Sequence, residues 1–268
     1  MNKIFTSAIL LFGCCNLSVA QSGLGARLLA MGNNATAVKD VWSINTNPAG
    51  ITNLKQPKVA LSYGKTLFDT DISHQALAFV LPAKRSYIGL NVVRYGITEY
   101  NEINTGIAFA KTFGEQMSIG VKLNYHQIRI SNYGSTRGFS ADVGAIYQFN
   151  DVLTFGANIN NPSCQSYSTK NIAAKIPTIF AVGASYNASS KVLVATYIKK
   201  EVHQSIDVGL GVDYQLVEIF SLRAGITAKA FKQYAGFGLN YKSLTVDMAV
   251  ENDPNLGYTP QIAVGYAF

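Results

Sequence analysis

The stretch Ile206-Asp207-Val208-Gly209-Leu210-Gly211-Val212-Asp213-Tyr214 decides the fold, because apolar and polar residues alternate along it without a break. Successive side chains of a β-strand point to opposite faces, so this segment has one apolar and one polar face. The same alternation recurs at 244–251 and in the last residues, 261–268. About fourteen such segments with little sequence between them predict an all-β fold, a transmembrane antiparallel β-barrel.

The connections between the predicted strands sort by length. Those after even-numbered strands are tight, as at Gly114-Glu115 and Asn150-Asp151, and most of those after odd-numbered strands are longer, at 95–103, 131–137, 161–175 and 252–258. Outer-membrane barrels have short periplasmic turns and longer outer loops, so an even strand number would leave both ends of the barrel in the periplasm. The short connection at Lys229-Ala230 breaks this pattern and leaves a count of twelve open. The predicted strands are 57–66, 72–81, 84–94, 104–112, 116–130, 138–149, 152–161, 176–187, 190–199, 204–214, 217–229, 231–241, 243–251 and 259–268.

The amino-terminus has the features of a cleaved secretory signal peptide at residues 1–20. Lys3 precedes an apolar run at 4–13, which is too short to span a bilayer, and small residues follow at 18–20. A lipoprotein box at 11–14 is the alternative, although a bulky residue stands at its second position. Signal-peptide cleavage would make Gln21 the first residue of the mature chain and mark the protein for export to the outer membrane of a Gram-negative bacterium.

Cysteine and histidine usage argues against a metal centre. Cleavage would remove two of the three cysteines and leave Cys164 alone, so the mature chain has no internal disulfide. His74, His126 and His203 lie far apart, and no pair of cysteines has metal-ligand spacing. We therefore expect neither a metal nor a cofactor. No Ser/His/Asp grouping stands in a catalytic motif either, so an enzyme is not expected.

Composition favours a membrane barrel over the soluble alternatives. Charged residues make up 14% of the chain, Tyr and Phe are plentiful, and no 18 apolar residues run together, which excludes a helical membrane protein. A soluble β-sandwich or lipocalin-like barrel would show Lys and Glu outside, whereas the polar faces here carry Gly, Ser and Asn, which suit a lumen. The net charge of +7 favours anionic lipid head groups. The basic residues are scattered, so nucleic acid is not an expected partner.

A set of charged residues falls on the polar faces and would line the lumen. Lys122 and Asp142 are on neighbouring predicted strands, and Asp207 and Asp213 are on the strand before Arg223. An unpaired charge in a confined lumen is costly, so the favoured interpretation is structural pairing across the wall. A polar conduction path is the alternative, although a selective pore would show one dominant sign. The set comprises Lys122, Asp142, Asp207, Asp213, Arg223, Asp247 and Glu251.

The segment before the first strand does not alternate. Residues 25–32 predict a short helix that ends at its glycine, and the run at 47–50 predicts a turn, because proline fixes its own torsion and restricts the residue before it. These residues are too apolar for a free tail. We therefore expect residues 21–56 to fold into the lumen as a hatch, and residues 57–268 to form the barrel.

The opening of this segment carries a resemblance to a known family. A Gly-Ala-Arg-x-x-x-Met-Gly start, then Asn-Pro-Ala-Gly, then a fourteen-strand pattern resembles the FadL superfamily of outer-membrane proteins, closest to its PorV/PorQ branch. The matching residues are Gly25, Ala26, Arg27, Met31, Gly32, Asn47, Pro48, Ala49 and Gly50. The resemblance implies an amino-terminal hatch inside a fourteen-strand barrel.

The resemblance also implies two functions. PorV-type members are non-catalytic partners of the type IX protein secretion system, and FadL-type members carry hydrophobic molecules such as long-chain fatty acids across the outer membrane. We expect an accessory or scaffold subunit of a secretion or barrel-assembly machine, with passive FadL-like transport of hydrophobic small molecules as the alternative. A transporter should have an apolar cavity beside Asn47 and Pro48, and a scaffold should have a filled lumen. The expected partners are outer-membrane lipid, the barrel-assembly machinery during insertion, and other outer-membrane or periplasmic proteins.

The last strand carries a separate signal. Gly265, Tyr266 and the terminal Phe268 resemble the carboxy-terminal sequence that the barrel-assembly machinery reads. A lipid-facing last strand would have the same residues, and the two interpretations are compatible.

Overall fold

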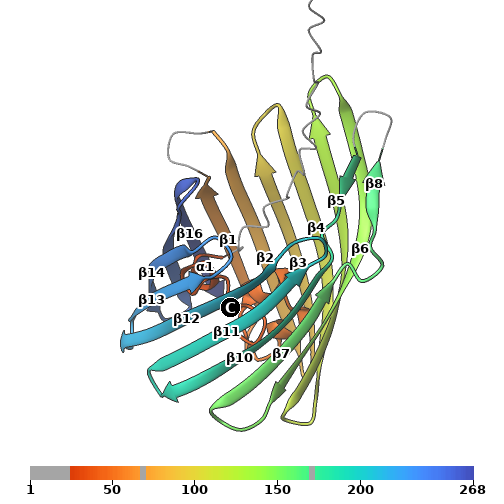
Figure 1. The fold of residues 1–268 in the computed structure, drawn as a ribbon. Helices are drawn as coiled ribbons and strands as arrows, with labels where there is room; N and C mark the ends of the chain where they lie inside the picture. The colour runs from red at the N-terminus through yellow and green to blue at the C-terminus, as the bar shows by residue number, and fades with distance from the viewer. Residues whose placement is uncertain (1–24, 67–70, 169–172) are drawn as a thin grey trace, which may run out of the picture.

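The chain forms a closed antiparallel barrel of fourteen strands, which confirms the predicted fold class. It is described from a computed structural model covering residues 25–66, 71–168 and 173–268, so the predicted signal peptide lies outside the described residues. Strands follow one another around the barrel in chain order, and β1 closes the ring by pairing with β16 (Figure 1). The barrel strands are β1 (Lys58–Lys65), β2 (Ser73–Ala83), β3 (Ser86–Gly96), β4 (Tyr100–Phe113), β5 (Met117–Ile130), β6 (Gly134–Gln148), β7 (Leu153–Asn160), β10 (Ile179–Ser189), β11 (Val192–Glu201), β12 (Ile206–Val217), β13 (Phe220–Thr227), β14 (Lys232–Tyr241), β15 (Leu244–Asp253) and β16 (Gly257–Ala267).

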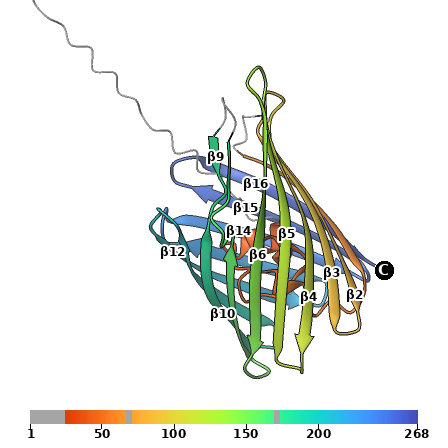
Figure 2. The same cartoon turned by 90° about the vertical axis from the view of Figure 1, so that its right-hand side faces the viewer.

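Two strands on one side of the barrel are longer than the sequence pattern predicts. The predicted outer connections at 95–103 and 131–137 are largely strand, because β4 begins at Tyr100 and β6 at Gly134, so that these strands reach 14 and 15 residues. β5 between them has the predicted extent to within one residue and is 14 residues long. A strand needs only about 9–11 residues to cross a bilayer. The apolar alternation fades where these strands leave the membrane, although the hydrogen-bonded ladder continues, and Figure 2 shows β5 and β6 rising at the upper end of the barrel.

The long connection after β7 also contains structure that the pattern missed. Residues 161–175 were predicted as a loop, but β8 (Ser166–Ser168) and β9 (Ala173–Lys175) pair there as a separate two-stranded sheet. Tyr167 of this sheet packs with Ile128 of β5 and Ile176 in a small apolar cluster. Cys164 lies exposed in the same connection.

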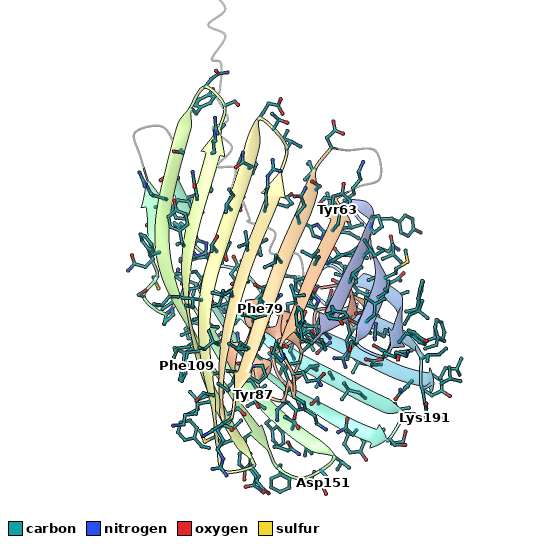
Figure 3. The ribbon with its side chains drawn as sticks, turned by 180° about the vertical axis from the view of Figure 1, so that it is seen from behind. Tyr63, Phe79, Tyr87, Phe109, Asp151 and Lys191 are labelled. Atoms are coloured by element: carbon teal, nitrogen blue, oxygen red, sulfur yellow. The ribbon has the colours of Figure 1, made fainter. Side chains whose placement is uncertain are left out.

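The two ends of the barrel differ. Tight turns join β2 to β3, β10 to β11, β12 to β13 and β14 to β15, at the end where β1 begins and β16 finishes. In Figure 3, Asp151 and Lys191 mark this end, and Tyr63 lies toward the opposite one. Short turns and strand termini belong to the periplasmic end of outer-membrane barrels, so the end with β8 and β9 faces the cell exterior. The connection at 228–231 joins two barrel strands, so the count is fourteen and not twelve.

The wall is apolar outside and polar inside, the reverse of a soluble barrel. Outward side chains such as Leu61, Ile107, Leu123 and Val182 are more than half exposed. The lumen side of the strands instead buries polar and charged groups, among them Asn91, Lys122 and Arg223. Lipid is the solvent that such an outer surface requires, which places the chain in the outer membrane. No helix in the described part of the chain is long and apolar enough to cross a membrane.

Residues 25–52 lie inside the barrel and fill its middle, whereas Asn53, Lys55 and Gln56, which lead to β1, are exposed (Figure 1). Three short helical segments form this hatch: α1 (Ala26–Ala30), η1 (Val41–Asn45) and η2 (Pro48–Ile51). α1 contacts β13–β16, and η2 contacts β4–β6 on the other side. The main apolar core is therefore the contact between the hatch and the inner wall rather than a core between two sheets.

Candidate functional site

The helical segments of the hatch begin at residues whose side chains cap the helix, or end at a glycine that adopts a positive φ. Gly32 ends α1 at a φ of 68°, and its N–H donates to Leu29 O at 2.9 Å. Asp40 caps η1 by accepting the Trp42 N–H at 2.9 Å. Asn47 caps η2 in the same way, so the predicted turn at 47–50 is the start of a single 3-10 turn.

Asn47 also fastens the hatch to the wall. It is fully buried, and its amide donates to Thr36 O at 2.6 Å and to Ala145 O of β6 at 3.2 Å. A buried amide that satisfies both the hatch backbone and the wall backbone cannot be replaced by an apolar residue without orphaning those carbonyls. The other residues of the predicted hatch motif are largely buried around it. Ala26, Met31, Pro48, Ala49 and Gly50 are buried, while the Arg27 side chain is partly exposed.

The wall receives the hatch through inward-facing glycines. Three pairs of glycines stand directly opposite each other on neighbouring strands: Gly120 and Gly144, Gly156 and Gly183, and Gly211 and Gly225. A Cβ at Gly144 would lie 1.9 Å from Asn47 Oδ1, and one at Gly211 would lie 2.1 Å from Met31 O. Several strands thus present bare backbone where the hatch touches them.

Inward-facing glycines have no side chain to fill the lumen and would by themselves leave internal space. The structure shows that this space is occupied. The hatch backbone lies against Gly211, Ala30 lies against Gly236, the Tyr197 ring lies against Gly209, and the Arg223 guanidinium covers Gly238. The glycines that contact the hatch could have been found from the sequence, because the alternation along each strand shows which glycines face inward.

A chain of ion pairs joins the hatch to the inner wall near the periplasmic end. Arg27 Nη1 lies 2.8 Å from Asp40 Oδ2, and Arg27 Nε lies 3.1 Å from Asp213 Oδ2 on β12. Asp213 also pairs with Arg223 of β13 at 3.1 Å, and Arg223 Nη1 reaches Asp247 of β15 at 2.6 Å. These five groups alternate in sign, so each buried charge has an opposite neighbour, as the buried state requires.

Burial and ion pairing shift the pKa values of Arg27 and Asp40 in opposite directions. Burial alone would lower the pKa of Arg27, but the carboxylates of Asp40 and Asp213 raise it above its ordinary value. Burial alone would raise the pKa of Asp40, but the nearby Arg27 charge and the Trp42 N–H bring it below its ordinary value. Both groups are therefore charged at neutral pH, and the ion pair that holds the hatch is intact.

The remaining predicted lumen charges do not form one network. Asp207 pairs with Lys199 at 3.6 Å and not with Arg223, because the register places Lys199 opposite Asp207. Glu251 pairs with Lys232 at 2.7 Å near the outer mouth. Lys199 and Lys232 were missed by sequence reasoning, although their inward parity on β11 and β14 could have revealed them.

Lys122 and Asp142 stand opposite each other on β5 and β6, as predicted, but their charged groups have other partners. Asp142 accepts from Asn124 Nδ2 at 2.7 Å and from the Asn161 N–H at 3.1 Å. Lys122 Nζ lies 3.5 Å from Asn45 Oδ1 of the hatch. The predicted ion pair is therefore replaced by amide contacts, because asparagines flank both groups.

Two large cavities lie on opposite sides of the hatch. One of about 340 Å³ opens near the β10–β11 turn at the periplasmic end and is lined by the Arg27–Asp213–Arg223 ion pairs. The other, of about 420 Å³, lies toward the outer mouth, and its lining includes Leu28, Tyr197 and Tyr234 as well as the charged Lys199, Asp207, Lys232 and Glu251. Trp42 lines both cavities and is 3% exposed, so its side chain is part of the partition between them.

A smaller cavity of about 90 Å³ lies toward the outer end between β3 and β7. Polar residues such as Lys122, Asn124, His126 and Ser140 line it together with the apolar Val93, Ile103 and Ile176. Neither Asn47 nor Pro48, beside which a transporter was expected to have an apolar cavity, lines any of these three cavities. The hatch residue Asn45 lines both outer cavities, and Thr46 lines the larger of them. Within the described ranges, no three His, Cys, Asp or Glu side chains are grouped so that they could hold a metal ion.

The predicted carboxy-terminal signal residues lie where β16 closes the barrel. Tyr266 is paired with Val59 of β1, and the Phe268 N–H donates to Pro57 O at 2.9 Å. The Tyr266 and Phe268 rings meet edge to face, with centroids 5.2 Å apart, on the outer surface. Gly265 faces inward, toward Thr245 and Lys58. Their role as an assembly signal stays a prediction.

These features define an integral outer-membrane β-barrel with an internal amino-terminal hatch. Solved structures share this fold. The chain is similar to the CymD monoaromatic hydrocarbon channel, with a TM-score of 0.72, 14% identity, and coverage of 92% of this chain and 98% of that one. It is similar to the Ralstonia pickettii toluene transporter TbuX, with a TM-score of 0.70, 13% identity, and coverage of 92% and 99%. It is also similar to a Pseudomonas aeruginosa FadL homologue, with a TM-score of 0.70, 10% identity, and coverage of 91% and 98%.

The likeness lies in the fold and not in the sequence. No family model matches the chain, and no curated protein matches it. The named neighbours are a channel, a transporter and a FadL homologue. The PorV/PorQ resemblance of the hatch motif stays a prediction.

Proposed function

We propose that this protein is a passive channel for small hydrophobic molecules across the outer membrane. The observation that carries the proposal is the pair of cavities, about 420 and 340 Å³, that meet at Trp42 from opposite sides of the hatch. Each is large enough for a molecule of one aromatic ring. The shared fold with a hydrocarbon channel and a toluene transporter supports the same direction.

The lining of the outer cavity suits such a cargo. Leu28, Trp42, Tyr197 and Tyr234 contribute apolar and aromatic surface, and Tyr197 and Tyr234 each present a ring beside one hydroxyl group. A hydrophobic molecule entering this cavity would contact the hatch directly. Passage to the periplasm then requires movement of Trp42 and of the ion pairs beneath it.

The chain provides its own reporter for this proposal. Trp42 is the single tryptophan of the sequence, so its fluorescence reports on the partition between the cavities without labelling. We would place the purified protein in lipid nanodiscs, titrate it with toluene and follow tryptophan emission. The proposal predicts a saturable change in emission, because toluene in the outer cavity replaces the surroundings of the indole.

A pair of matched variants makes this measurement specific. Ala181 faces the outer cavity and is buried, so Ala181→Phe should fill the space and abolish the saturable change. Ala224 points outward to lipid, so Ala224→Phe adds the same side chain where it should have no effect on the titration. Equal emission changes in the wild-type protein and Ala181→Phe would contradict the proposal. So would an emission change that rises linearly with the toluene concentration without saturating, because that is the behaviour of toluene dissolving in the lipid.

An accessory role in a protein machine is a second proposal. The observation that favours it is the close packing of the hatch against the middle of the wall, in which Ala26, Ile44 and Ile51 of the hatch are completely buried. A barrel closed in this way can serve as a membrane-embedded contact surface. Purification of the tagged protein from outer membranes in mild detergent, with mass spectrometry of co-purifying proteins, tests this role. A stoichiometric secretion or assembly partner would support it, and a solitary barrel would count against it.

A further inference from the structure

The outward-facing side chains of the barrel show a one-sided charge distribution. On the described strands, Asp and Glu occupy only inward-facing positions or the connections, so no carboxylate points outward from the wall. Basic residues do point outward. Arg94 on β3, Arg129 on β5 and Arg137 on β6 are exposed, and none of them makes an ion pair or side-chain hydrogen bond with another described residue.

The sheet register gathers these three arginines. Arg94 is opposite Ile103 of β4, Ile103 is opposite Gln127 of β5, and Gln127 is opposite Arg137 of β6. Arg129 is the next outward residue of β5 beyond Gln127. Neighbouring strands are about 4.8 Å apart, so the three Cα atoms lie within roughly 15 Å of one another. The long, flexible arginine side chains can therefore converge on one ligand.

The cluster lies where the wall leaves the apolar layer. Toward the barrel middle, β5 presents Val121 and Leu123 to the outside, followed by Tyr125, whose ring lies 5.4 Å from that of Phe139 on β6. Phe139 is 68% exposed, as expected for an aromatic residue at the membrane interface. β5 has 14 residues, and Arg129 is the last but one, so it lies beyond the part that the apolar core requires.

We propose that Arg94, Arg129 and Arg137 bind the phosphate groups of the glycolipid in the outer leaflet. Guanidinium groups bind phosphate in a bidentate manner and remain charged at every physiological pH. The wall offers them no carboxylate to compete with the lipid. Acyl chains of the same lipid would pack on the aromatic and aliphatic surface below. This site is on the outside of the barrel and is independent of the proposed transport path.

Native mass spectrometry of the purified full chain tests the proposal directly. The probe is bisphosphorylated lipid A, titrated into detergent-solubilised wild-type protein and into Arg94→Gln/Arg129→Gln/Arg137→Gln. The triple variant loses three positive charges near the anionic lipid, so it should bind at least roughly tenfold more weakly. A control, Lys111→Gln, removes an outward charge at the periplasmic end of β4 and should leave binding unchanged.

Two further measurements keep the outcome decisive. Wild-type protein should bind dephosphorylated lipid A as weakly as the triple variant binds the bisphosphorylated form, and equal binding of both lipids would overturn phosphate recognition. Replacement of the three arginines by lysine keeps the charge and should retain part of the affinity. Wild-type affinity in the glutamine variant, judged folded by its heat-modifiable gel migration, would overturn the assignment of these residues.

Discussion

Trp42 owes its position to a neighbour without a side chain. Gly25 has a φ of 112°, and a Cβ there would lie 2.2 Å from Cγ of the Trp42 ring. The indole therefore packs against the start of the hatch. The backbone N–H of Trp42 donates a hydrogen bond to the Asp40 carboxylate, which also accepts one from Arg27. A substitution of any of these residues should therefore shift the Trp42 side chain, which separates the two cavities.

This arrangement predicts a pH dependence of the hatch. The folded-state pKa of Asp40 is below its ordinary value of 3.8, so its contribution to hatch stability is complete above pH 3.8 and is lost as the pH falls further, through the folded value. Trp42 emission of the wild-type protein should therefore be constant from pH 7 to about 4 and change below that. Asp40→Asn should show altered emission already at pH 7, since loss of one partner of a buried pair costs about 3 kcal/mol.

Asp207→Asn is the matched control for this titration. Asp207 pairs with Lys199 on the other side of the hatch, so its removal should leave the emission profile at the wild-type position. Asp213 and Asp247 are also carboxylates of the ion-pair chain, so the comparison rests on the difference between Asp40→Asn and the wild-type protein. An identical profile for the two would exclude Asp40 as the group responsible.

The sequence predicts some of the residues that hold the hatch, but not all of their partners. The hatch motif identified Arg27 and Asn47, but it could not show that Asp40 and Asp213 would meet at one guanidinium, since they are 173 residues apart in the chain (213 minus 40). Asp213 was placed beside Arg223 correctly by strand adjacency. Asp207 was not, because a ladder register cannot be read from alternation alone.

Among the elements, the paired glycines have the clearest consequence. Gly211 of β12 and Gly225 of β13 are opposite each other, and the backbone of Met31 and Gly32 lies on both. Any side chain here must push the hatch inward or bend the wall. Overpacking of this kind typically costs about 1–3 kcal/mol.

We therefore expect Gly211→Val to displace α1 without opening the barrel. The thermal midpoint of heat-modifiable migration should fall, and single-channel conductance in a planar bilayer should rise, because the hatch no longer seals against β12. Ala224→Val adds a similar volume on the lipid side of the adjacent strand and should behave as the wild-type protein. Unchanged conductance in Gly211→Val would show that the hatch seals the lumen without this contact.

The strands were predictable from the sequence because lipid covers the outer face of the wall while the inner face is polar. Where lipid covers the wall, alternation is strict and strands such as β12 and β16 were located to within a few residues. At the outer ends of β4 and β6, residues 100–103 and 134–137 do not alternate between apolar and polar, so the recognisable pattern begins later than the strand does. The β8–β9 pair, with three residues in each strand, is too short to alternate recognisably.

For the molecule as a whole, closure between β1 and β16 is the decisive contact. The Phe268 N–H donates to Pro57 O, and the Tyr266 and Phe268 rings meet edge to face. Deletion of Phe268 should lower the amount of protein inserted in outer membranes several-fold, measured by quantitative immunoblotting of the membrane fraction. Phe149→Ala removes another exposed aromatic residue, in a periplasmic turn, and serves as the control. Normal insertion of the deletion variant would dismiss the terminal residue as an assembly signal.

The contact between α1 and strands β13–β16 has a consequence for the order of events during biogenesis. The hatch is synthesised and exported before every strand, yet the wall that α1 contacts belongs to the strands made last. It cannot settle until the final hairpins have arrived, so an immature barrel in the membrane is an unsealed one. Sealing the pore is therefore the last step of maturation, and a cell can tolerate this protein only if the time between membrane insertion and hatch docking is brief.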